Sequence, residues 1–511
     1  MKQFDYDVAI IGGGSAGYAA ARTTTGAGLR TAVVEGGKEV GGLCILRGCM
    51  PTKALLYAAE VMHLARHPEP WGICPGNVGF DFKKVMARKN ALIREFADYR
   101  RQQLVGGKFD FIRANARFLD AYTLELGREH RLPDCGKSRD CKTKDPPAGS
   151  RRSRNTTLTA AHFIIATGSR VAPPPLPQLR ETGYLTSDDA LVLKKLPQSL
   201  IVLGGGPTAC EFAQFFARFG VKVILIQRSA SILKEFDTDA AAEIEKVFRR
   251  EGIKVFTSTR LLDARLVARA SRPSESHRQD ARATTKTVSF EHDGKTVSVS
   301  AEEVLFALGR VPNIADLDLA AAGVKTAYGR IAANEFMQTS APHIYTAGDC
   351  TGPHEIVHIA VQQGEIAAHN IACPDAPRRM DCRLLISVVF TEPQTGFVGL
   401  TEKEANAHGT PFLVASYPFN DHGKSLIMEA KDGFVKLLAD PKSGEILGGA
   451  CVGPVGGELL HEIVVAMAKR MTVHELAAMP HYHPTLAEIW TYPAEELAWK
   501  ILSSTSSGVK P

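Results

Sequence analysis

Residues 6–17 read YDVAIIGGGSAG, a short apolar run that leads directly into a cluster of glycines. The run Tyr6–Ile11 predicts a buried strand, and the alanine-rich segment that follows, up to about Gly26, predicts a helix. A strand, a glycine turn and a helix in this order form the phosphate-binding part of a doubly wound α/β sheet. This stretch therefore predicts a dinucleotide-binding unit.

The three spaced glycines of this turn have separate roles in such a unit. Gly12 would allow the tight turn, Gly14 would let a pyrophosphate approach the backbone, and Gly17 would let the helix pack against the strand. The next apolar run, Thr31–Val34, predicts a second parallel strand, and it ends at Glu35, where a carboxylate would bind ribose hydroxyls. The alternative, an ordinary glycine turn, leaves this register of strand, helix and acid unexplained.

A second strand, glycine turn and helix begin at Leu200. The positions that match the glycines of the first turn are Gly204, Gly206 and Ala209. Gln227 then occupies the place that Glu35 has in the first unit. A neutral amide followed by Arg228 would not repel a ribose 2′-phosphate, and Arg228 could pair with it. The second unit therefore predicts an NAD(P)(H) site with a preference for NADP(H).

Residues 41–53 read GGLCILRGCMPTK and contain a cysteine pair, Cys44 and Cys49. Because Pro51 suits the first turn of a helix, Cys49 is expected at a helix N-terminus, where the helix dipole favours a thiolate. Two cysteines at this spacing could also be buried thiols or half of a zinc site, although no second Cys/His pair at ligand spacing lies nearby. The stretch closely follows the first dinucleotide unit, so we favour a redox-active pair beside FAD and predict no metal site.

Composition and charge limit the class of protein. The 511 residues are 44% hydrophobic, so they can form several buried cores, and two to four domains are expected. A net charge of +6 gives no reason to expect binding to nucleic acid or to a membrane. No apolar run approaches the ~18 residues of a membrane span, and the N-terminus lacks the form of a signal peptide. We therefore expect a cytoplasmic protein whose ten cysteines remain mostly thiols.

Two polar stretches, at about residues 128–157 and 268–287, interrupt the pattern of strands and helices. Both are rich in basic and small polar residues, and we interpret them as surface insertions. Cys135 and Cys141 lie in the first stretch, where a second redox pair is the less favoured interpretation. An interaction tail formed by the basic residues 151–154 is likewise less favoured than a solvated loop.

Three further turns are candidates for contact with a cofactor. Gly168 lies in the turn of small residues that ends the predicted strand Phe163–Ser169, and Gly309 ends another buried run. Asp349 lies at the C-terminal tip of the run Ile344–Asp349, and such tips face the ligand crevice in a doubly wound sheet. An N-cap role for Asp349 remains the alternative.

Beyond Pro377 the pattern changes to the mixed strands and helices of an α+β unit. Near its end, residues 481–488 read HYHPTLAE, so that a proline turn places His483 and Glu488 begins a helix. A carboxylate that holds an imidazole in one tautomer is a common way to build a general base. From these residues alone, His483 could also be an ordinary surface histidine.

In this order, the two glycine turns, the Cys-x4-Cys pair, the Gly-Asp at 348–349 and the His-Pro-Thr-x-x-Glu at 483–488 resemble the pyridine nucleotide-disulfide oxidoreductases. Lipoamide dehydrogenase, glutathione reductase and mercuric reductase belong to that family. The resemblance implies an α/β fold with two Rossmann-like dinucleotide-binding domains, for FAD and NAD(P), and a C-terminal α+β interface domain that forms a homodimer. The implied boundaries are 1–190 and 307–377 for the two parts of the FAD domain, 191–306 for the NAD(P) domain and 378–511 for the interface domain.

The resemblance also implies roles for the chemically active residues. Cys49 would face the flavin, and Cys44 would be the exposed thiol that exchanges with substrate. His483, held by Glu488, would serve the active site of the neighbouring subunit. The remaining roles that the resemblance implies are an ion pair near the flavin for Lys53 and Glu211, and contacts to the FAD ribose and ribitol for Glu35 and Asp349.

Three residues depart from the pattern of the family, and they are Leu43, Arg47 and Pro207. Leu43 replaces a common threonine, Arg47 replaces a small apolar residue, and Pro207 fills a position that often holds a gating tyrosine. We hypothesise that a positive charge at Arg47 raises the reduction potential of the flavin or recruits an anionic substrate.

The resemblance favours reduction or oxidation of a small disulfide or dithiol, most like lipoamide dehydrogenase, because the His-Pro-Thr-x-x-Glu segment supplies the proton chemistry that dithiols need. A mercuric reductase is the second choice, since that enzyme carries a C-terminal cysteine pair and lacks the histidine, whereas the last cysteine here is Cys451 and His483 is present. A glutathione reductase is the third choice. A flavin-binding assembly subunit without activity is the remaining alternative, and the intact active residues argue against it.

Overall fold

A computed structural model describes residues 3–127, 156–268 and 284–506. The chain forms two compact units, each built from three segments. The first unit contains Met1–Met50, Ala91–Val171 and Arg310–Met380, and the second contains Pro51–Asn90, Ala172–Gly309 and Asp381–Pro511. This grouping leaves the four domain boundaries implied by the resemblance as predictions. Most of the two predicted insertions, with Cys135 and Cys141, lies outside the described residues.

The first unit is built on a mainly parallel sheet. Its strands β1 (Tyr6–Ile11) and β2 (Thr31–Val34) have the predicted bounds. The parallel part continues through β3 (Asp110–Ile112) on one side, and β6 (Thr156–Ile165) and β18 (Ile344–Thr346) on the other. Ile11 lies opposite both Val34 and Ile165, so the carboxyl ends of these strands meet at one edge of the sheet. This edge is where a doubly wound sheet binds its ligand.

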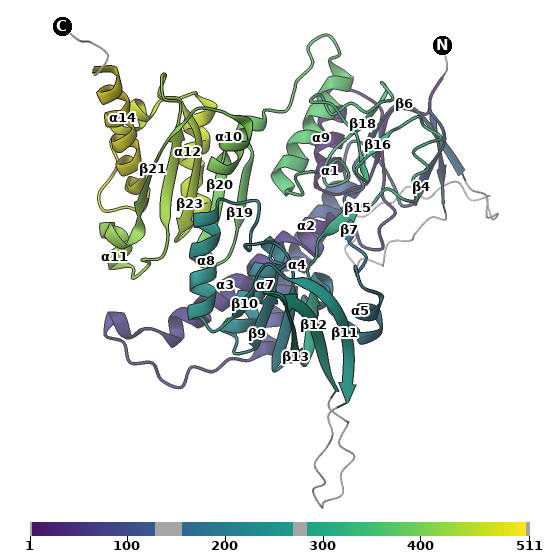
Figure 1. Ribbon diagram of the computed structural model, residues 1–511. Helices are drawn as coiled ribbons and strands as arrows, with labels where there is room; N and C mark the ends of the chain where they lie inside the picture. The colour runs from purple at the N-terminus through teal and green to yellow at the C-terminus, as the bar shows by residue number, and fades with distance from the viewer. Residues whose placement is uncertain (1–2, 128–155, 269–283, 507–511) are drawn as a thin grey trace, which may run out of the picture. The chain divides into compact units, whose positions relative to one another are not determined.

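Two helices of small residues pack together in the first unit (Figure 1). They are α1 (Ser15–Gly26), which follows the first glycine turn, and α9 (Val357–Ala372). A Cβ atom at Gly364 of α9 would lie 2.3 Å from the backbone oxygen of Ala16, so a larger residue would push the helices apart. Glycine and alanine thus bring a late segment of the chain next to the glycine turn.

Further short strands complete the sheets of the first unit. The strands β4 (Ala116–Asp120) and β5 (Thr123–Leu126) form a hairpin that pairs with β6 through β5. The strand β6 ends at Ile165 and is followed by the predicted turn of small residues, after which a separate strand β7 (Ser169–Val171) pairs with β15 (Arg310–Pro312). The outer ends of the predicted insertions also belong to strands, because β6 begins at Thr156 and β12 (Thr284–His292) begins at Thr284.

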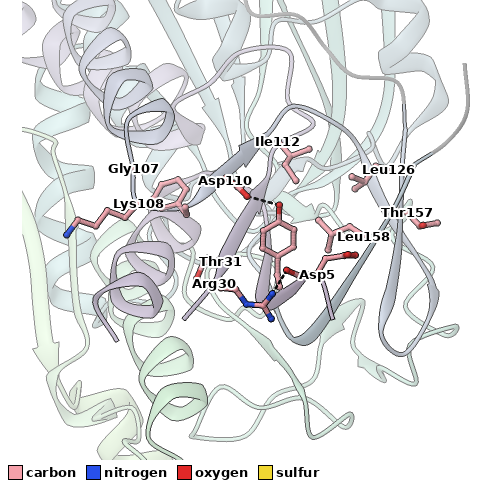
Figure 2. A pocket seen from close by; sticks show the side chains of 12 residues that line it. Asp5, Arg30, Thr31, Gly107, Lys108, Asp110, Ile112, Leu126, Thr157 and Leu158 are labelled. Atoms are coloured by element: carbon pink, nitrogen blue, oxygen red, sulfur yellow. Dashed lines mark hydrogen bonds between the residues drawn. The ribbon is translucent and has the colours of Figure 1, made fainter. Parts of the chain in front are cut away.

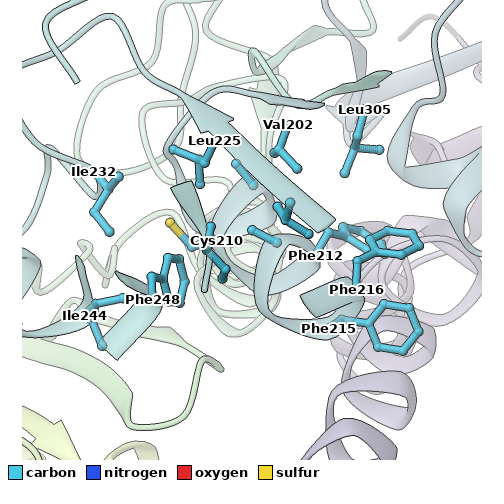
Figure 3. Packing of buried hydrophobic residues seen from close by; sticks show 14 of the residues in the cluster. Val202, Cys210, Phe212, Phe215, Phe216, Leu225, Ile232, Ile244, Phe248 and Leu305 are labelled. Carbon is cyan, nitrogen blue, oxygen red and sulfur yellow. The ribbon is translucent and has the colours of Figure 1, made fainter. Parts of the chain in front are cut away.

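The second unit contains a four-stranded parallel sheet with the order β10-β9-β8-β14. These strands are β8 (Ser199–Leu203), β9 (Lys222–Ile226), β10 (Lys254–Phe256) and β14 (Glu303–Phe306). Two of its helices are α7 (Pro207–Arg218) and α8 (Thr238–Arg250). Figure 3 shows the core that these elements share, with Phe212, Phe215 and Phe216 of α7 among its buried side chains. This sheet is the second predicted dinucleotide fold.

The C-terminal part of the second unit is an α+β structure, as predicted. Its five-stranded antiparallel sheet consists, in spatial order, of β19 (Ile386–Val389), β20 (Gln394–Gly399), β23 (Ile446–Gly453), β22 (Phe434–Ala439) and β21 (Leu413–Pro418). The helices α12 (Gly456–Ala468) and α14 (Thr491–Ser506) pack on this sheet (Figure 1). They cover a core in which Trp490 is completely buried.

The other helices and strands connect these sheets. The helices are α2 (Gly42–Leu46), α3 (Cys49–Arg66), α4 (Phe82–Val105), α5 (Pro177–Thr182), α6 (Ser187–Ala190), α10 (Glu402–His408), α11 (Gly423–Ile427) and α13 (Val473–Ala478). The strands are β11 (Arg260–Ala268) and β13 (Lys295–Ala301), which pair with β12, and the short pair β16 (Thr326–Ala327) and β17 (Arg330–Ile331). Across the described ranges, every helix is too short or too polar to cross a membrane.

Candidate active site

The first glycine turn leaves no space for a side chain at two of its glycines, Gly12 and Gly17. Gly12 has φ +107°, and a Cβ atom there would lie 2.3 Å from the backbone oxygen of Ala166. A Cβ atom at Gly17 would lie 1.8 Å from the oxygen of Gly12. Gly14 is the N-cap of α1, and no side chain caps that helix end. The backbone N–H groups of α1 therefore remain available to the pyrophosphate of a dinucleotide.

Glu35 is fixed by the loops around it. Its Oε2 accepts a hydrogen bond from Gly13 N–H at 2.8 Å, and its Oε1 accepts one from Gly37 N–H at 2.5 Å. Each carboxylate oxygen has a further lone pair, so Glu35 can still bind ribose hydroxyls. Glu35 thus fits the ribose of a dinucleotide such as FAD, and its contact with that ribose stays a prediction.

Asp349 lies near the end of β18 but caps no helix. Its Oδ2 accepts a hydrogen bond from Ser169 Oγ at 2.6 Å, and Arg310 Nε donates to the same Oγ at 2.8 Å. The helix α9 begins eight residues later, and its N-cap is Ile356, so the alternative N-cap role is wrong. The neighbouring Gly168 has φ +68°, as a tight turn at this edge requires.

The cysteine pair lies next to the first glycine turn. Cys44 is on the short helix α2, and Cys49 is the first residue of α3, as predicted; both are half-buried. A Cβ atom at Gly42, which has φ +78°, would lie 2.8 Å from Gly14 Cα, so the backbones of α2 and the turn are in close contact. The 18-residue helix α3 favours a thiolate at its N-terminal Cys49. A dinucleotide on this turn would therefore bind beside the cysteine pair.

Two arginines of the first unit affect the charge in this region. Arg47 pairs with Glu39 at 2.6 Å, and both side chains are about half exposed. The Glu39 carboxylate thus offsets the positive charge of Arg47, on which our hypothesis about this residue depends.

Arg100 of α4 lies over the ring of Tyr18, 4.2 Å from its centroid. Burial lowers the pKa of Arg100, while interactions with Tyr18 and Cys44 raise it.

The sequence analysis missed this position of Arg100. It lies 56 residues beyond Cys44 on another helix, and no local motif marks it. A guanidinium that interacts with Cys44 would stabilise its thiolate.

The predicted ion pair in the second unit is present. Lys53 Nζ lies 2.8 and 2.9 Å from the two carboxylate oxygens of Glu211. Glu211 is 4% exposed and also accepts the N–H of Phe390 at 3.0 Å. The Lys53 ammonium is 4.6 Å from the centroid of the Phe390 ring. Three contacts thus hold one ammonium and one carboxylate in fixed positions.

The second glycine turn repeats the geometry of the first. Gly204 has φ +114°, and a Cβ atom there would lie 2.3 Å from the oxygen of Ala307. Gly206 is the N-cap of α7, and Ala209 is completely buried. Gly309, which follows β14, has φ +112°. The helix N-terminus is again without a side-chain cap and can receive a phosphate.

Gln227 is buried at the end of β9 and is held by its own loop. Its Oε1 accepts the N–H of Arg228 at 3.1 Å, and its Nε2 donates to the oxygen of Ser231 at 3.4 Å. A Cβ atom at Gly205 would lie 2.9 Å from Gln227 Cγ, so this side chain packs on the glycine turn. The Arg228 side chain is exposed.

His483 and Glu488 form the predicted pair in the second unit. His483 Nδ1 lies 2.9 Å from Glu488 Oε2. The His483 side chain is 77% exposed, whereas that of Glu488 is 11% exposed. A buried carboxylate thus fixes one nitrogen of an imidazole, while the ring remains accessible to a substrate. The sequence analysis missed two buried residues next to this pair, His422 and Ser425.

Two cavities lie apart from the glycine turns. A cavity of about 670 Å³ lies at the amino ends of β1 and β2 (Figure 2). There Tyr6 donates a hydrogen bond to Asp110 at 2.8 Å, and Arg30 pairs with Asp7 at 2.9 Å. These polar groups satisfy one another, and the glycine turn lies at the other end of β1, so this cavity is not a candidate active site.

The second cavity, of about 220 Å³, lies in the second unit next to the Lys53 ion pair. Glu392 lines it, and its backbone is held by Gln214 through hydrogen bonds of 2.6 and 2.7 Å. Burial raises the pKa of Glu392 to about 8, and the nearby Glu60 acts in the same direction. Burial thus favours the protonated form of the Glu392 carboxyl group.

Two protein families match this chain in consecutive segments. Residues 6–364 match the family described as pyridine nucleotide-disulphide oxidoreductase. Residues 385–494 match the dimerisation domain of the pyridine nucleotide-disulphide oxidoreductases. The first match contains both glycine turns and the cysteine pair, and the second contains His483 and Glu488.

The chain is also similar to characterised relatives over nearly its whole length. It is 35% identical to the dihydrolipoyl dehydrogenase of Bacillus subtilis, over 95% of this chain and 96% of the relative. It is 30% identical to the mercuric reductase of Staphylococcus aureus, over 95% of this chain and 81% of the relative. Among solved structures, the Cu(II) complex of the HOCl-induced flavoprotein disulfide reductase RclA from Escherichia coli matches with a TM-score of 0.77 at 25% identity, covering 97% of this chain and all of that one.

Proposed function

The chain belongs to the pyridine nucleotide-disulphide oxidoreductases, FAD-dependent enzymes that act on sulfur groups with NAD(P)(H), and we propose that its substrate is a small disulfide or dithiol of the dihydrolipoyl type. The observation that carries this proposal is the pair of His483 and Glu488, because a dithiol must lose protons as its sulfurs are oxidised. The similarity to dihydrolipoyl dehydrogenases supports the same choice.

We propose that Cys44 and Cys49 form the redox-active pair. A substrate thiolate attacks the Cys44 sulfur of the oxidised pair, a mixed disulfide forms, and Cys49 leaves as a thiolate that the N-terminus of α3 stabilises. The second substrate thiol gives its proton to His483 and attacks the substrate sulfur of the mixed disulfide, which breaks the bond to Cys44 and releases Cys44 as a thiolate. The substrate leaves as a disulfide, and the cysteine pair has gained its two electrons.

Bound FAD supplies the two-electron chemistry that links this pair to the nicotinamide. We propose that the glycine turn at Gly12, Gly14 and Gly17 holds its pyrophosphate, with Glu35 on the ribose. Asp349 and Gly168 would hold the ribitol side of the same cofactor. The close packing of Gly42 on Gly14 supports this placement of the cysteine pair beside the cofactor.

We propose that the second turn, with Gly204, Gly206, Ala209 and Gly309, binds NADP(H) in preference to NAD(H). The neutral Gln227 and the exposed Arg228 support this choice, because neither repels a 2′-phosphate. Lys53 and Glu211 would place fixed charges next to the flavin during hydride transfer.

We further propose a cytoplasmic homodimer. The match of the dimerisation domain over residues 385–494 supports the dimer. In such a dimer His483 of one subunit would serve the cysteine pair of the other. A reducing compartment suits an enzyme whose cysteine pair cycles through a dithiol.

Turnover and thiol counting test this function together. NADPH should expose about two additional thiols per chain in the wild-type holoenzyme and none in Cys44→Ser, as measured with a thiol reagent under anaerobic conditions. Turnover with dihydrolipoamide should exceed that with glutathione disulfide, Hg(II) or Cu(II), and His483→Gln should slow it without slowing the exposure of thiols. Faster turnover of a metal ion would instead favour the activity named for the mercuric reductase relative. No NADPH-dependent thiols at all would refute the disulfide mechanism.

A further inference from the structure

Glu488 is shared between two imidazole rings. His483 Nδ1 lies 2.9 Å from Glu488 Oε2 and 3.2 Å from Glu488 Oε1, and His422 Nε2 lies 3.4 Å from the same Oε1. The two rings have opposite environments, since the His422 side chain is 0% exposed and that of His483 is 77% exposed. One ring therefore faces solvent and substrate, and the other lies entirely inside the protein.

The surroundings of His422 determine its tautomer. Its Nδ1 lies 2.8 Å from the hydroxyl of Ser425, which is also completely buried. Within the part of the chain that the structure describes, its Nε2 has no hydrogen-bond partner at normal distance and faces the Glu488 carboxylate. A lone pair at Nε2 would be repelled by the carboxylate, whereas an N–H is attracted. The proton therefore belongs on Nε2, and Ser425 donates its hydroxyl to Nδ1.

The buried ring is also neutral. Burial lowers the pKa of His422, Glu488 opposes this effect, and His483 adds to it; the net change is a lowered pKa. At neutral pH His422 is therefore a neutral donor and does not compete with His483 for a proton.

Two aromatic rings pack on His422. Its ring packs edge-on against Phe419 and Tyr492, with centroids 6.4 and 6.3 Å away. Tyr417 stacks on Tyr492, and burial together with a hydrogen bond to Asp421 raises the pKa of Tyr417 to about 12. The groups in contact with the Glu488 carboxylate in this cluster are thus its two histidines.

We propose that Ser425 and His422 are positioning residues for the proposed proton acceptor: the Nε2–H of His422 attracts Oε1 of Glu488 and shares its negative charge, so that Oε2 stays the closer oxygen to His483. This inference rests on the proposed function of His483. Charge shared with His422 is not available to stabilise the imidazolium of His483. The network thus lets His483 release the substrate proton at a lower pH than a simple His–Glu pair would.

The test compares three variants of the FAD-loaded enzyme. His422→Leu removes the donor, His422→Gln keeps an N–H that can reach Glu488, and Ser425→Ala removes the group that sets the tautomer. The probe is the ring signal of His483 in protein labelled with 13C at histidine Cε1, assigned by its loss in His483→Gln. In His422→Leu the midpoint of this signal should move to higher pH by about half a unit or more, with a smaller shift in Ser425→Ala and recovery in His422→Gln.

A nearby pair of similar type provides the control. Both ring nitrogens of His481 have partners other than Glu488, since Nε2 lies 2.6 Å from Glu462 and Nδ1 lies 3.1 Å from the oxygen of Met479. His481→Gln should leave the midpoint of His483 unchanged. Turnover of dihydrolipoamide by His422→Leu should show a lower kcat with an unchanged KM, and the acid limb of its pH profile should move in the same direction as the midpoint.

Several results would overturn the proposal. An unchanged midpoint in His422→Leu and Ser425→Ala would show that His422 does not act on the pair, and a move to lower pH would contradict charge sharing. If His422→Leu fails to fold, an unchanged midpoint in Ser425→Ala overturns the proposal in the same way. If the wild type turns over no dithiol, the proposed function fails, yet the midpoints still report on the geometry around Glu488.

Discussion

Replacing Lys53 by methionine would leave a buried carboxylate without its counter-charge. In the wild type, the Lys53 ammonium lies within 2.9 Å of both oxygens of Glu211, which is 4% exposed. In Lys53→Met, the Glu211 carboxylate would lose the ammonium but keep the hydrogen bond from the Phe390 N–H at 3.0 Å. The converse variant, Glu211→Gln, leaves an ammonium whose side chain is 31% exposed and can be solvated.

The expected costs follow from this asymmetry. Removing one partner of a fully buried ion pair costs about 3–5 kcal/mol. Because Lys53 is partly exposed, water already screens part of its charge, and we expect a cost of about 2–4 kcal/mol for Lys53→Met. Glu211→Gln retains an acceptor for Phe390 and for Lys53, so we expect about 1 kcal/mol. The double variant should cost less than the sum, with a coupling of about 1 kcal/mol or more.

Urea unfolding of the holoenzyme at a fixed concentration of FAD measures these costs. The midpoints are comparable when the slopes agree and when flavin fluorescence and circular dichroism change together. Repeating the series at a second concentration of FAD separates loss of cofactor binding from loss of folding stability, since only the former depends on free FAD. The reasoning is wrong if Glu211→Gln costs as much as Lys53→Met, or if the double variant costs the full sum.

Three further predictions concern single residues. Arg100→Met should slow alkylation of reduced Cys44 by iodoacetamide by about threefold or more, because its guanidinium stabilises the thiolate; an equal rate would show that Arg100 does not act on Cys44. Gln227→Glu should lower the ratio of kcat/KM for NADPH to that for NADH by about tenfold or more, since a carboxylate repels a 2′-phosphate. Steady-state kinetics with both cofactors measure this ratio, and an unchanged ratio would contradict the prediction. Burial raises the pKa of Glu392 to about 8. The stability that Glu392 contributes is therefore lost as the pH rises from the pKa of this residue in the unfolded chain through 8. In urea unfolding, the free energy of unfolding of Glu392→Gln relative to that of the wild type should therefore be higher at about pH 9 than at about pH 5. The same difference between variant and wild type at both pH values would contradict the raised pKa.

The local elements of the site could be predicted because their signals are short-range. The strands Tyr6–Ile11 and Thr31–Val34 have the predicted bounds, since each is an apolar run that ends at a polar or glycine residue. Cys49 was expected at a helix N-terminus from Pro51 alone, and α3 begins there. The helix that carries Cys44 was not predicted, because α2 has five residues and no capping side chain.

Contacts between distant segments could not be read in the same way. Arg100 reaches Tyr18 from a helix about eighty residues later, and the sequence around Arg100 is an ordinary polar helix face. His422 and Ser425 lie more than sixty residues before Glu488, in a segment without a recognisable motif. Their buried polar groups become informative when the fold shows which group each one faces. Sequence patterns therefore marked the residues that we propose for redox chemistry and proton transfer, but not the groups that we propose tune them.

The two glycine turns show how the structure changes the interpretation of a residue that the sequence had marked. Glu35 and Gln227 occupy equivalent positions, and charge alone distinguished them in the sequence. In the structure, both oxygens of Glu35 accept backbone N–H groups, whereas Gln227 accepts one from Arg228 and donates one to the oxygen of Ser231. A carboxylate cannot make that donation, so Gln227→Glu would place an oxygen about 3.4 Å from another acceptor as well as repel a phosphate. The amide is thus required by its own loop, and a change of cofactor preference at this position should come with a loss of stability that a simple exchange of charge would not cause.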